Sequence, residues 1–327
     1  MRVPTLPPRT LFILVDGLGL GTPDPLLNPI YGGSCPCLQH LLDHQAVPID
    51  AGMGVGGIPQ SATGQTALLT GVNAAREMGR HVEGFPGPSL REIIRDRNIY
   101  DQLTALGSTS TFANAYFTAD MNEVRTRRIQ SVTTVSALKA FDRVRDTAAM
   151  LEHQAVYQDL TRESLRERGY TGPLVTPAES ARDLLSIAAE HDFTLFEYFQ
   201  TDRMGHKGTR EEVNRVLALF DAFLAVAIKF AEQPGHLFLM TSDHGNIEES
   251  GSSSHSANPV PLVALGQGSE LLRTRIKSVT DVTPALVELY QDGSAGTPRP
   301  TEIQEISQGR AKPPAEPGIF QQAATGV

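Results

Sequence analysis

Short apolar runs and segments with helical spacing alternate along the chain. The run from Leu11 to Val15 ends at Asp16 and Gly17, which predicts a buried strand that carries a carboxylate into a tight turn. Similar runs predict further strands at 47–51, 109–115, 193–199 and 236–241. This alternation predicts an α/β fold in which helices cover both faces of a largely parallel sheet.

The segments between these runs carry helix start signals. Thr176 to Glu179 reads T-P-A-E, a capping box with Pro at the first helical position, so we expect a helix that continues to about Glu190. Thr209 to Glu212 repeats the capping pattern ahead of a longer amphipathic helix. Other helices are expected at 35–43, 61–71 and 99–106.

The pattern divides the chain into three parts. Residues 119–172 are charged and helical in spacing, without a clear strand, and we interpret them as a helical insertion. Residues 1–118 and 173–290 then form one core domain. Residues 291–327 are rich in Gly, Pro, Ala and Gln, a composition typical of a disordered tail.

Composition narrows the class of protein. Of the 327 residues, 40% are hydrophobic and 20% are charged, which is ordinary for a globular protein. The net charge of −9 argues against binding to nucleic acid or to an anionic membrane surface. Because no apolar run approaches the roughly 20 residues that span a bilayer, we expect a cytoplasmic protein. The sequence leaves the oligomeric state unknown.

Carboxylate and imidazole side chains gather after the predicted strands. Asp202 and His206 are spaced i, i+4, so one face of a helical turn would present both to the same ion. One such cluster alone is more typical of hydrogen bonding in a loop, but several clusters at strand ends predict a metal centre. The candidate ligands are Asp16, Asp202, His206, Asp243, His244 and His255.

Ser61 stands where an apolar helix begins and allows two interpretations. A hydroxyl there is a preferred N-cap. It is also well placed as a nucleophile that ligates a metal, because the helix N-terminus favours both an alkoxide and a phosphoryl group. Arg76, Arg80, His81 and Lys207 are candidate substrate contacts, since a phosphate needs cations, although each is equally compatible with a solvated surface position.

Four motifs together resemble one enzyme superfamily. They are V-D-G-L-G at 15–19, T-D-R-M-G-H at 201–206, S-D-H-G-N at 242–246 and H-S-A-N-P-V-P at 255–261. Their order and spread over most of residues 11–290 resemble the metalloenzyme core of the alkaline phosphatase superfamily, and most closely its cofactor-independent phosphoglycerate mutase and phosphopentomutase branch. The resemblance implies an alkaline phosphatase-like three-layer αβα sandwich.

The resemblance also implies two ligand sets and a nucleophile. One ion would be held by Asp202, His206 and His255. The second ion, beside Ser61, would be held by Asp16, Asp243 and His244. Residues 61–71 are similar to the family's nucleophile helix, with Thr63 as the reserve nucleophile.

The predicted function is divalent-metal-dependent phosphoryl transfer on a small phosphorylated substrate. Mixed Asp and His ligation favours two Mn or Zn ions, with Mg also compatible. The mutases carry a large cap domain that shields a phosphoenzyme from water, whereas the insertion here is short, which favours a hydrolase with a phosphoserine intermediate. The alternatives are a phosphomutase and, from another class, a non-catalytic metal-binding regulatory protein.

Overall fold

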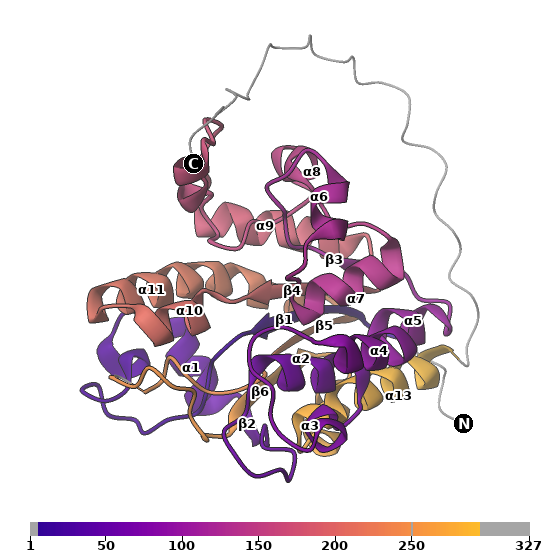
Figure 1. The fold of residues 1–327 in the computed structure, drawn as a ribbon, viewed down its shortest axis with the longest axis horizontal. Coiled ribbons are helices and arrows are strands. Elements are labelled where there is room, and N and C mark those ends of the chain that lie inside the picture. Colours follow the sequence, from indigo (N-terminus) through magenta and orange to yellow (C-terminus); the bar gives the residue numbers. More distant parts are fainter. Residues whose placement is uncertain (1–5, 250, 295–327) are drawn as a thin grey trace.

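A six-stranded sheet forms the centre of the protein in a computed structural model that describes residues 6–249 and 251–294 (Figure 1). The strand order is β2-β6-β5-β1-β4-β3. All strands run parallel to β1 except β6, which is antiparallel to both of its neighbours. Their bounds are β1 Arg9–Val15, β2 Ala46–Ile49, β3 Ser110–Phe112, β4 Phe193–Tyr198, β5 His236–Ser242 and β6 Val260–Gly266.

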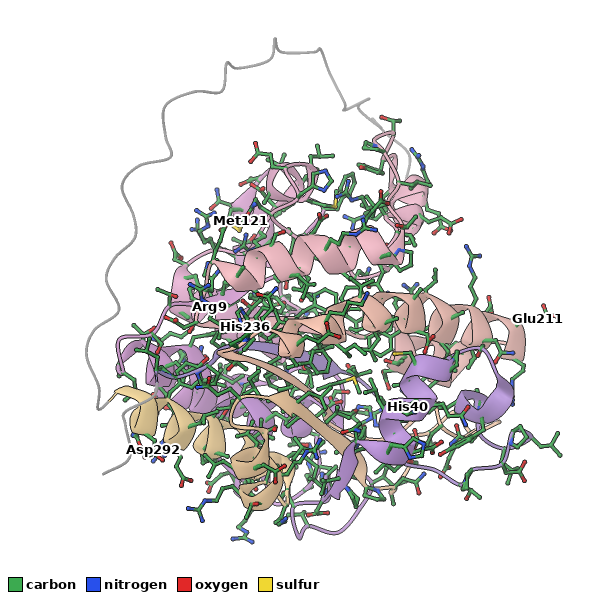
Figure 2. All side chains as sticks on the ribbon, turned by 180° about the vertical axis from the view of Figure 1, so that it is seen from behind. Arg9, His40, Met121, Glu211, His236 and Asp292 are labelled. Atoms are coloured by element: carbon green, nitrogen blue, oxygen red, sulfur yellow. The ribbon has the colours of Figure 1, made fainter. Side chains whose placement is uncertain are left out.

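Strand β1 lies in the middle of the sheet. Its register places Arg9 opposite His236 of β5, and Figure 2 shows the two labelled residues side by side. Successive side chains of a strand point to opposite faces. Leu11 and Ile13 therefore pack into the core on one face, while Phe12 packs into the core on the other. Burial on both faces explains the unbroken apolar run in the sequence.

Helices cover both faces of the sheet (Figure 1). One face packs against α1 (Pro36–His44), α9 (Pro177–Ala189) and α11 (Arg210–Ala227). The other packs against α2 (Ser61–Thr70), α4 (Pro88–Arg97), α5 (Ile99–Thr104) and α13 (Val282–Ser294). The expected three-layer α/β/α arrangement with a largely parallel sheet is confirmed. Both predicted capping boxes are present, at Thr176 and Thr209.

The segment between β3 and β4 contains α6 (Met121–Thr126), α7 (Val132–Phe141), α8 (Thr147–Leu151) and the 3-10 helix η2 (Glu163–Arg168). Helix α7 contributes Val132 and Val135 to the main core. A smaller apolar cluster that includes Met150 and Tyr170 lies apart from it. Val156 also pairs through its backbone with Ala113 and Ala115, so the segment is anchored to the sheet edge as well as to the helices.

The remaining elements are short, with eight residues or fewer. They are η1 Pro29–Gly32, α3 Ala74–Met78, α10 Gln200–Lys207, η3 Ile228–Glu232, α12 Ser269–Arg275 and η4 Val279–Asp281. Helix α13 includes residues 291–294, and the rest of the predicted tail lies outside the described residues. Among the described helices, none is both long and apolar enough to cross a membrane.

Candidate metal centre

Three neighbouring parallel strands deliver the first carboxylates to one edge of the sheet. Asp16 directly follows β1, and Asp243 directly follows β5. Asp202 lies in α10, which begins two residues after β4. Because β5, β1 and β4 are adjacent and parallel, their carboxyl ends meet, which is where open α/β sheets place their sites.

Reversal of β6 brings His255 to the same edge. The connection from β5 to the antiparallel β6 must begin and end there, and it contains both His244 and His255. Ser256 donates its backbone N–H to the carbonyl of Gly245 at 2.9 Å, which closes this loop on itself. Ser61 lies at the start of the helix that follows β2, whose carboxyl end is at the same edge because β2 runs parallel to β1.

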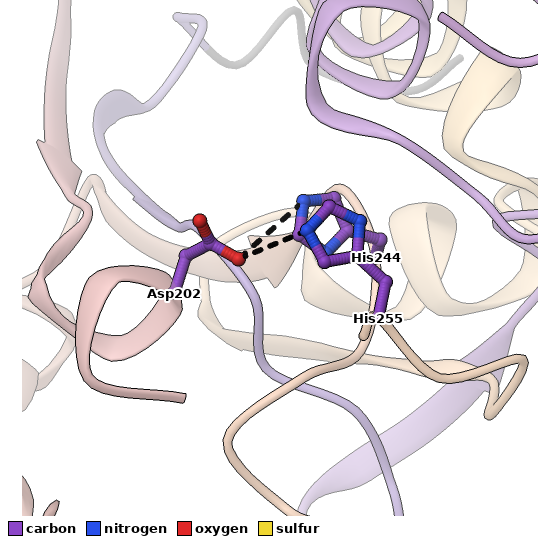
Figure 3. Close-up of side chains that lie close together, drawn as sticks. All are labelled: Asp202, His244 and His255. Carbon is purple, nitrogen blue, oxygen red and sulfur yellow. Dashed lines mark ion pairs between the residues drawn. The ribbon is translucent and has the colours of Figure 1, made fainter. Parts of the chain in front are cut away.

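One group of ligand atoms surrounds a single point. Asp202 Oδ1 lies 3.3 Å from His206 Nε2 and 3.2 Å from His255 Nε2. The two Nε2 atoms lie 2.9 Å apart. Ligand atoms bound at about 2.0–2.1 Å to one ion are separated by roughly 2.9–3.4 Å, so these spacings suit one divalent ion. Figure 3 shows Asp202 directed at the rings of His255 and His244.

A second group surrounds His244 Nε2. This atom lies 3.1 Å from Asp16 Oδ1, 3.6 Å from Asp243 Oδ2 and 2.8 Å from Ser61 Oγ. Asp243 Oδ2 is fully buried and accepts no hydrogen bond among the described residues. A buried carboxylate oxygen without a donor is unfavourable unless a cation satisfies it, and a divalent ion among these atoms would do so.

The three histidines all direct Nδ1 at a backbone carbonyl. His206 faces Ser253 at 2.7 Å, His255 faces Pro59 at 3.1 Å, and His244 faces its neighbour Gly245 at 3.3 Å. A carbonyl can only accept, so Nδ1 carries the proton and Nε2 of the neutral ring keeps its lone pair for a metal. The lone pairs of His206 and His255 then face each other, an arrangement that a shared cation stabilises.

The carboxylates and His244 shift one another's pKa values. Burial, followed by the charge of Asp243, raises the pKa of Asp16 well above its usual value. Burial alone would lower the pKa of His244, but the charges of Asp243 and Asp16 raise it to about 10. Burial opposes ionisation of Asp202, yet its close contact with His255 and the charge of His244 lower its pKa to about 2. The cluster thus favours positive charge at its centre.

Ion binding should release a proton from His244. With a pKa of about 10, this side chain is protonated at pH 7 when no ion is bound, and a metal must displace the proton from Nε2. Metal affinity should therefore rise with pH until about pH 10. Titration calorimetry in buffers of different protonation enthalpy should report net proton release when an ion binds. The exposed His40→Asn variant should behave like wild type, and a binding enthalpy independent of buffer would contradict the assignment.

Ser61 is the first residue of α2, and Gln60 occupies the N-cap without capping through its side chain. The N-cap interpretation of Ser61 is therefore wrong, because its hydroxyl contacts His244 instead. The reserve candidate Thr63 is fully buried, and its hydroxyl donates to Gln60 O and accepts from Val82 N, each at 3.2 Å. Its role in this structure is to hold the loop that precedes α4.

Two glycines allow α2 and the β1 loop to approach the ligands. A Cβ atom on Gly64 would lie 2.7 Å from the carbonyl oxygen of Asp243. A Cβ atom on Gly17 would lie 2.8 Å from Asp202, and Gly17 also has a φ of +74°. Side chains at either position would push the ligand loops apart.

Sequence reasoning missed Glu248, which is 1% exposed. Its Oε2 accepts N–H groups from Gly19 and Asn246, each at 2.8 Å, and its Oε1 accepts from Ser256 and Asn258. One carboxylate thereby joins the loop after β1, which carries Asp16, to both ends of the β5–β6 connection, which carries Asp243 and His255. The local sequence does not distinguish it from the adjacent, exposed Glu249. Asn246 was also missed, and its amide donates to Asp202 Oδ1 at 2.7 Å.

A cavity of about 640 Å³ opens beside the ligands. Asp16, Ser61, Asp202 and His206 line it, as does the predicted substrate contact Lys207. The other three predicted contacts are not among its lining residues: Arg76 and Arg80 are exposed, and His81 contacts the carbonyl of Val55 at 3.2 Å.

The chain matches one family model and several known sequences. A family model described as the Metalloenzyme superfamily matches residues 8–291. A 2,3-bisphosphoglycerate-independent phosphoglycerate mutase of Paracoccus denitrificans is 29% identical over 123 residues, covering 36% of this chain and 24% of that protein. The mutase of the same name from Cereibacter sphaeroides is 30% identical over 125 residues, with the same coverage. The matches thus span about a quarter of these curated relatives.

A solved structure shares the fold. The PH0037 protein from Pyrococcus horikoshii superimposes with a TM-score of 0.54 at 14% identity, covering 88% of this chain and 98% of that one. At this identity the likeness concerns the fold alone. The alkaline phosphatase of the Antarctic bacterium TAB5 is also similar, with a TM-score of 0.47, 13% identity and coverage of 88% and 99%.

Proposed function

Because the chain belongs to the Metalloenzyme superfamily, we propose that it is a two-metal phosphoryl-transfer enzyme, and specifically a phosphate-ester hydrolase with Ser61 as nucleophile. The observation that supports this most strongly is the position of Ser61 Oγ, 2.8 Å from His244 Nε2 and at the N-terminus of α2. A hydroxyl among metal ligands and free helix N–H groups is placed for attack on phosphorus.

Each ligand set has its own part in the proposal. Asp202, His206 and His255 would hold one divalent ion, and Asp16, Asp243 and His244 would hold the other beside Ser61. The bound ions would neutralise the charge of the phosphoryl oxygens and of the attacking and leaving oxygens. The mixed Asp and His ligands favour Mn or Zn, and Mg is also compatible.

Transfer through Ser61 proceeds in two displacements. In the first, Ser61 Oγ loses its proton and forms a bond to phosphorus, the bond to the ester oxygen breaks, and the leaving group takes up a proton and departs as an alcohol. The N-terminus of α2, where Gln60 provides no side-chain cap, would favour a phosphoryl group on Ser61. In the second displacement, water attacks the phosphoserine and releases inorganic phosphate and the free Ser61 hydroxyl.

Phosphomutase activity is the second candidate, since the sequence relatives carry that name. The cavity wall favours hydrolysis. Several of its side chains, including Arg127, Arg203 and Lys207, are exposed, so water has a path to Ser61. A mutase must instead keep water from the phosphoserine while the substrate reorients.

The proposal is tested by a screen of phosphate mono- and diesters with Mn, Zn or Mg. We expect release of inorganic phosphate from at least one ester class, with water as the acceptor. Isomerisation of a phosphorylated substrate without phosphate release would identify a mutase. Tight metal binding without turnover of any ester would identify a non-catalytic metal-binding protein and overturn the proposal.

A further inference from the structure

The polar wall of the cavity is largely occupied by bonds within the protein. Asn114 pairs with the backbone of Glu197 through both its amide nitrogen and its amide oxygen, at 2.7 and 2.8 Å. Gln130 accepts from Arg91 at 2.7 Å and donates to the Val124 carbonyl at 2.8 Å. These groups shape the wall and leave little hydrogen-bonding capacity for a ligand.

What the wall still offers to a ligand is apolar surface and positive charge. Phe85 is 54% exposed and Ile129 is 59% exposed, although both line the cavity. Arg127, Arg203 and Lys207 line it too, and their side chains make no hydrogen bond or ion pair with any residue that the structure describes. Exposed apolar side chains inside a concave site gain free energy when a ligand covers them.

The two kinds of surface come from different elements. Arg203 and Lys207 belong to α10, the helix that carries Asp202 and His206, so they lie on the phosphate side of the cavity. Phe85 precedes α4 and Ile129 follows α6, and neither belongs to a metal-ligand loop. The apolar part of the wall is therefore available to the leaving group of an ester.

The volume of the cavity also indicates the size of the substrate. A cavity of about 640 Å³ is in the range that accommodates ligands of roughly drug size. A phosphate on a leaving group of only two or three carbons would fill only a small part of that volume.

We infer that the substrate is a phosphate ester with a bulky leaving group, whose aromatic ring or comparable apolar part packs against Phe85 and Ile129. The inference rests on the proposed hydrolase function and specifies its substrate class. Recognition is divided: the metal ligands with Arg203 and Lys207 bind the phosphate, while Phe85 and Ile129 select the leaving group.

The test compares ethyl phosphate with naphthylethyl phosphate, two alkyl esters of similar leaving-group reactivity that differ in apolar size. Wild-type enzyme should show a KM about tenfold lower or more for the naphthylethyl ester. Phe85→Ala and Ile129→Ala should each raise that KM about 3- to 10-fold. The KM for ethyl phosphate, kcat for both esters and inhibition by inorganic phosphate should not change.

Leu26→Ala is the matched control, because Leu26 is 82% exposed and does not line the cavity. It should leave all these constants at wild-type values. Equal KM values for the two esters, or equal effects of Phe85→Ala on both, would overturn the inference and leave the hydrolase function standing. Absence of turnover with both esters would overturn the hydrolase function, and the inference with it.

Discussion

Replacing Ser61 with Ala should lower phosphate-ester turnover by about a thousandfold or more, while the protein stays folded and binds its ions. The reason is that Ser61 Oγ would form the bond to phosphorus. Stability should change by less than about 1 kcal/mol, because Gln60 and not Ser61 occupies the N-cap of α2. The turnover rate and the free energy of unfolding should therefore respond independently to the Ser61→Ala substitution.

Acid-quench trapping with a phosphorus-labelled ester is the decisive measurement. Wild-type protein should retain covalent label, and Ser61→Ala should retain none. Thr63→Ala should keep the label, since the Thr63 hydroxyl is engaged with Gln60 and Val82. Label on Ser61→Ala together with its loss in Thr63→Ala would transfer the role of nucleophile to Thr63. An active wild-type enzyme that never becomes labelled would indicate direct attack by water.

Removing divalent ions should abolish turnover and lower the melting temperature by about 5 °C or more. Ions bound only by the folded state stabilise it by mass action, by about 2.7 kcal/mol at a concentration one hundred times Kd. Without them, the repulsion between Asp16 and Asp243 is no longer offset, and Asp243 Oδ2 is left buried without a partner. Differential scanning calorimetry with and without EDTA measures the effect.

Asp243→Asn provides the control for chelation. Its melting temperature should respond less to EDTA than that of wild type, because one ligand set is incomplete. Re-addition of Mn, Zn or Mg one at a time should restore both activity and melting temperature, and the order of recovery identifies the preferred ion. A wild-type melting curve that EDTA leaves unchanged would argue against tight metal sites.

Local signals were sufficient for five of the six strands and for the capped helices, and they indicated the candidate ligands, whereas β6 at Val260–Gly266 was not predicted. Leu11 to Val15 is apolar throughout because β1 is covered on both faces, and Asp16 stands at its end. Thr176 and Thr209 start helices through contacts within three residues, so their capping boxes are visible in the sequence alone. Such features depend on residues that are close in the sequence, so the local pattern of apolar and polar residues predicts them directly.

Contacts between segments far apart in the chain determine which loops lie side by side, and therefore which candidate ligands are neighbours. The order β5-β1-β4 is not the order of the sequence, yet it makes Asp243, Asp16 and Asp202 neighbours. Reversal of β6 places His255 Nε2 2.9 Å from that of His206. No local pattern encodes these pairings, because the sheet order results from packing between segments far apart in the chain.

The same reason accounts for the residues that local patterns did not reveal. Glu248 and Glu249 are chemically identical neighbours, and only the folded loops show that Glu248 is enclosed by four donors while Glu249 faces solvent. Phe85 and Ile129 belong to segments more than forty positions apart, and only tertiary packing makes them walls of one cavity. The residue types of the candidate site were thus visible at strand ends, whereas its geometry and the apolar wall of the cavity arose from packing.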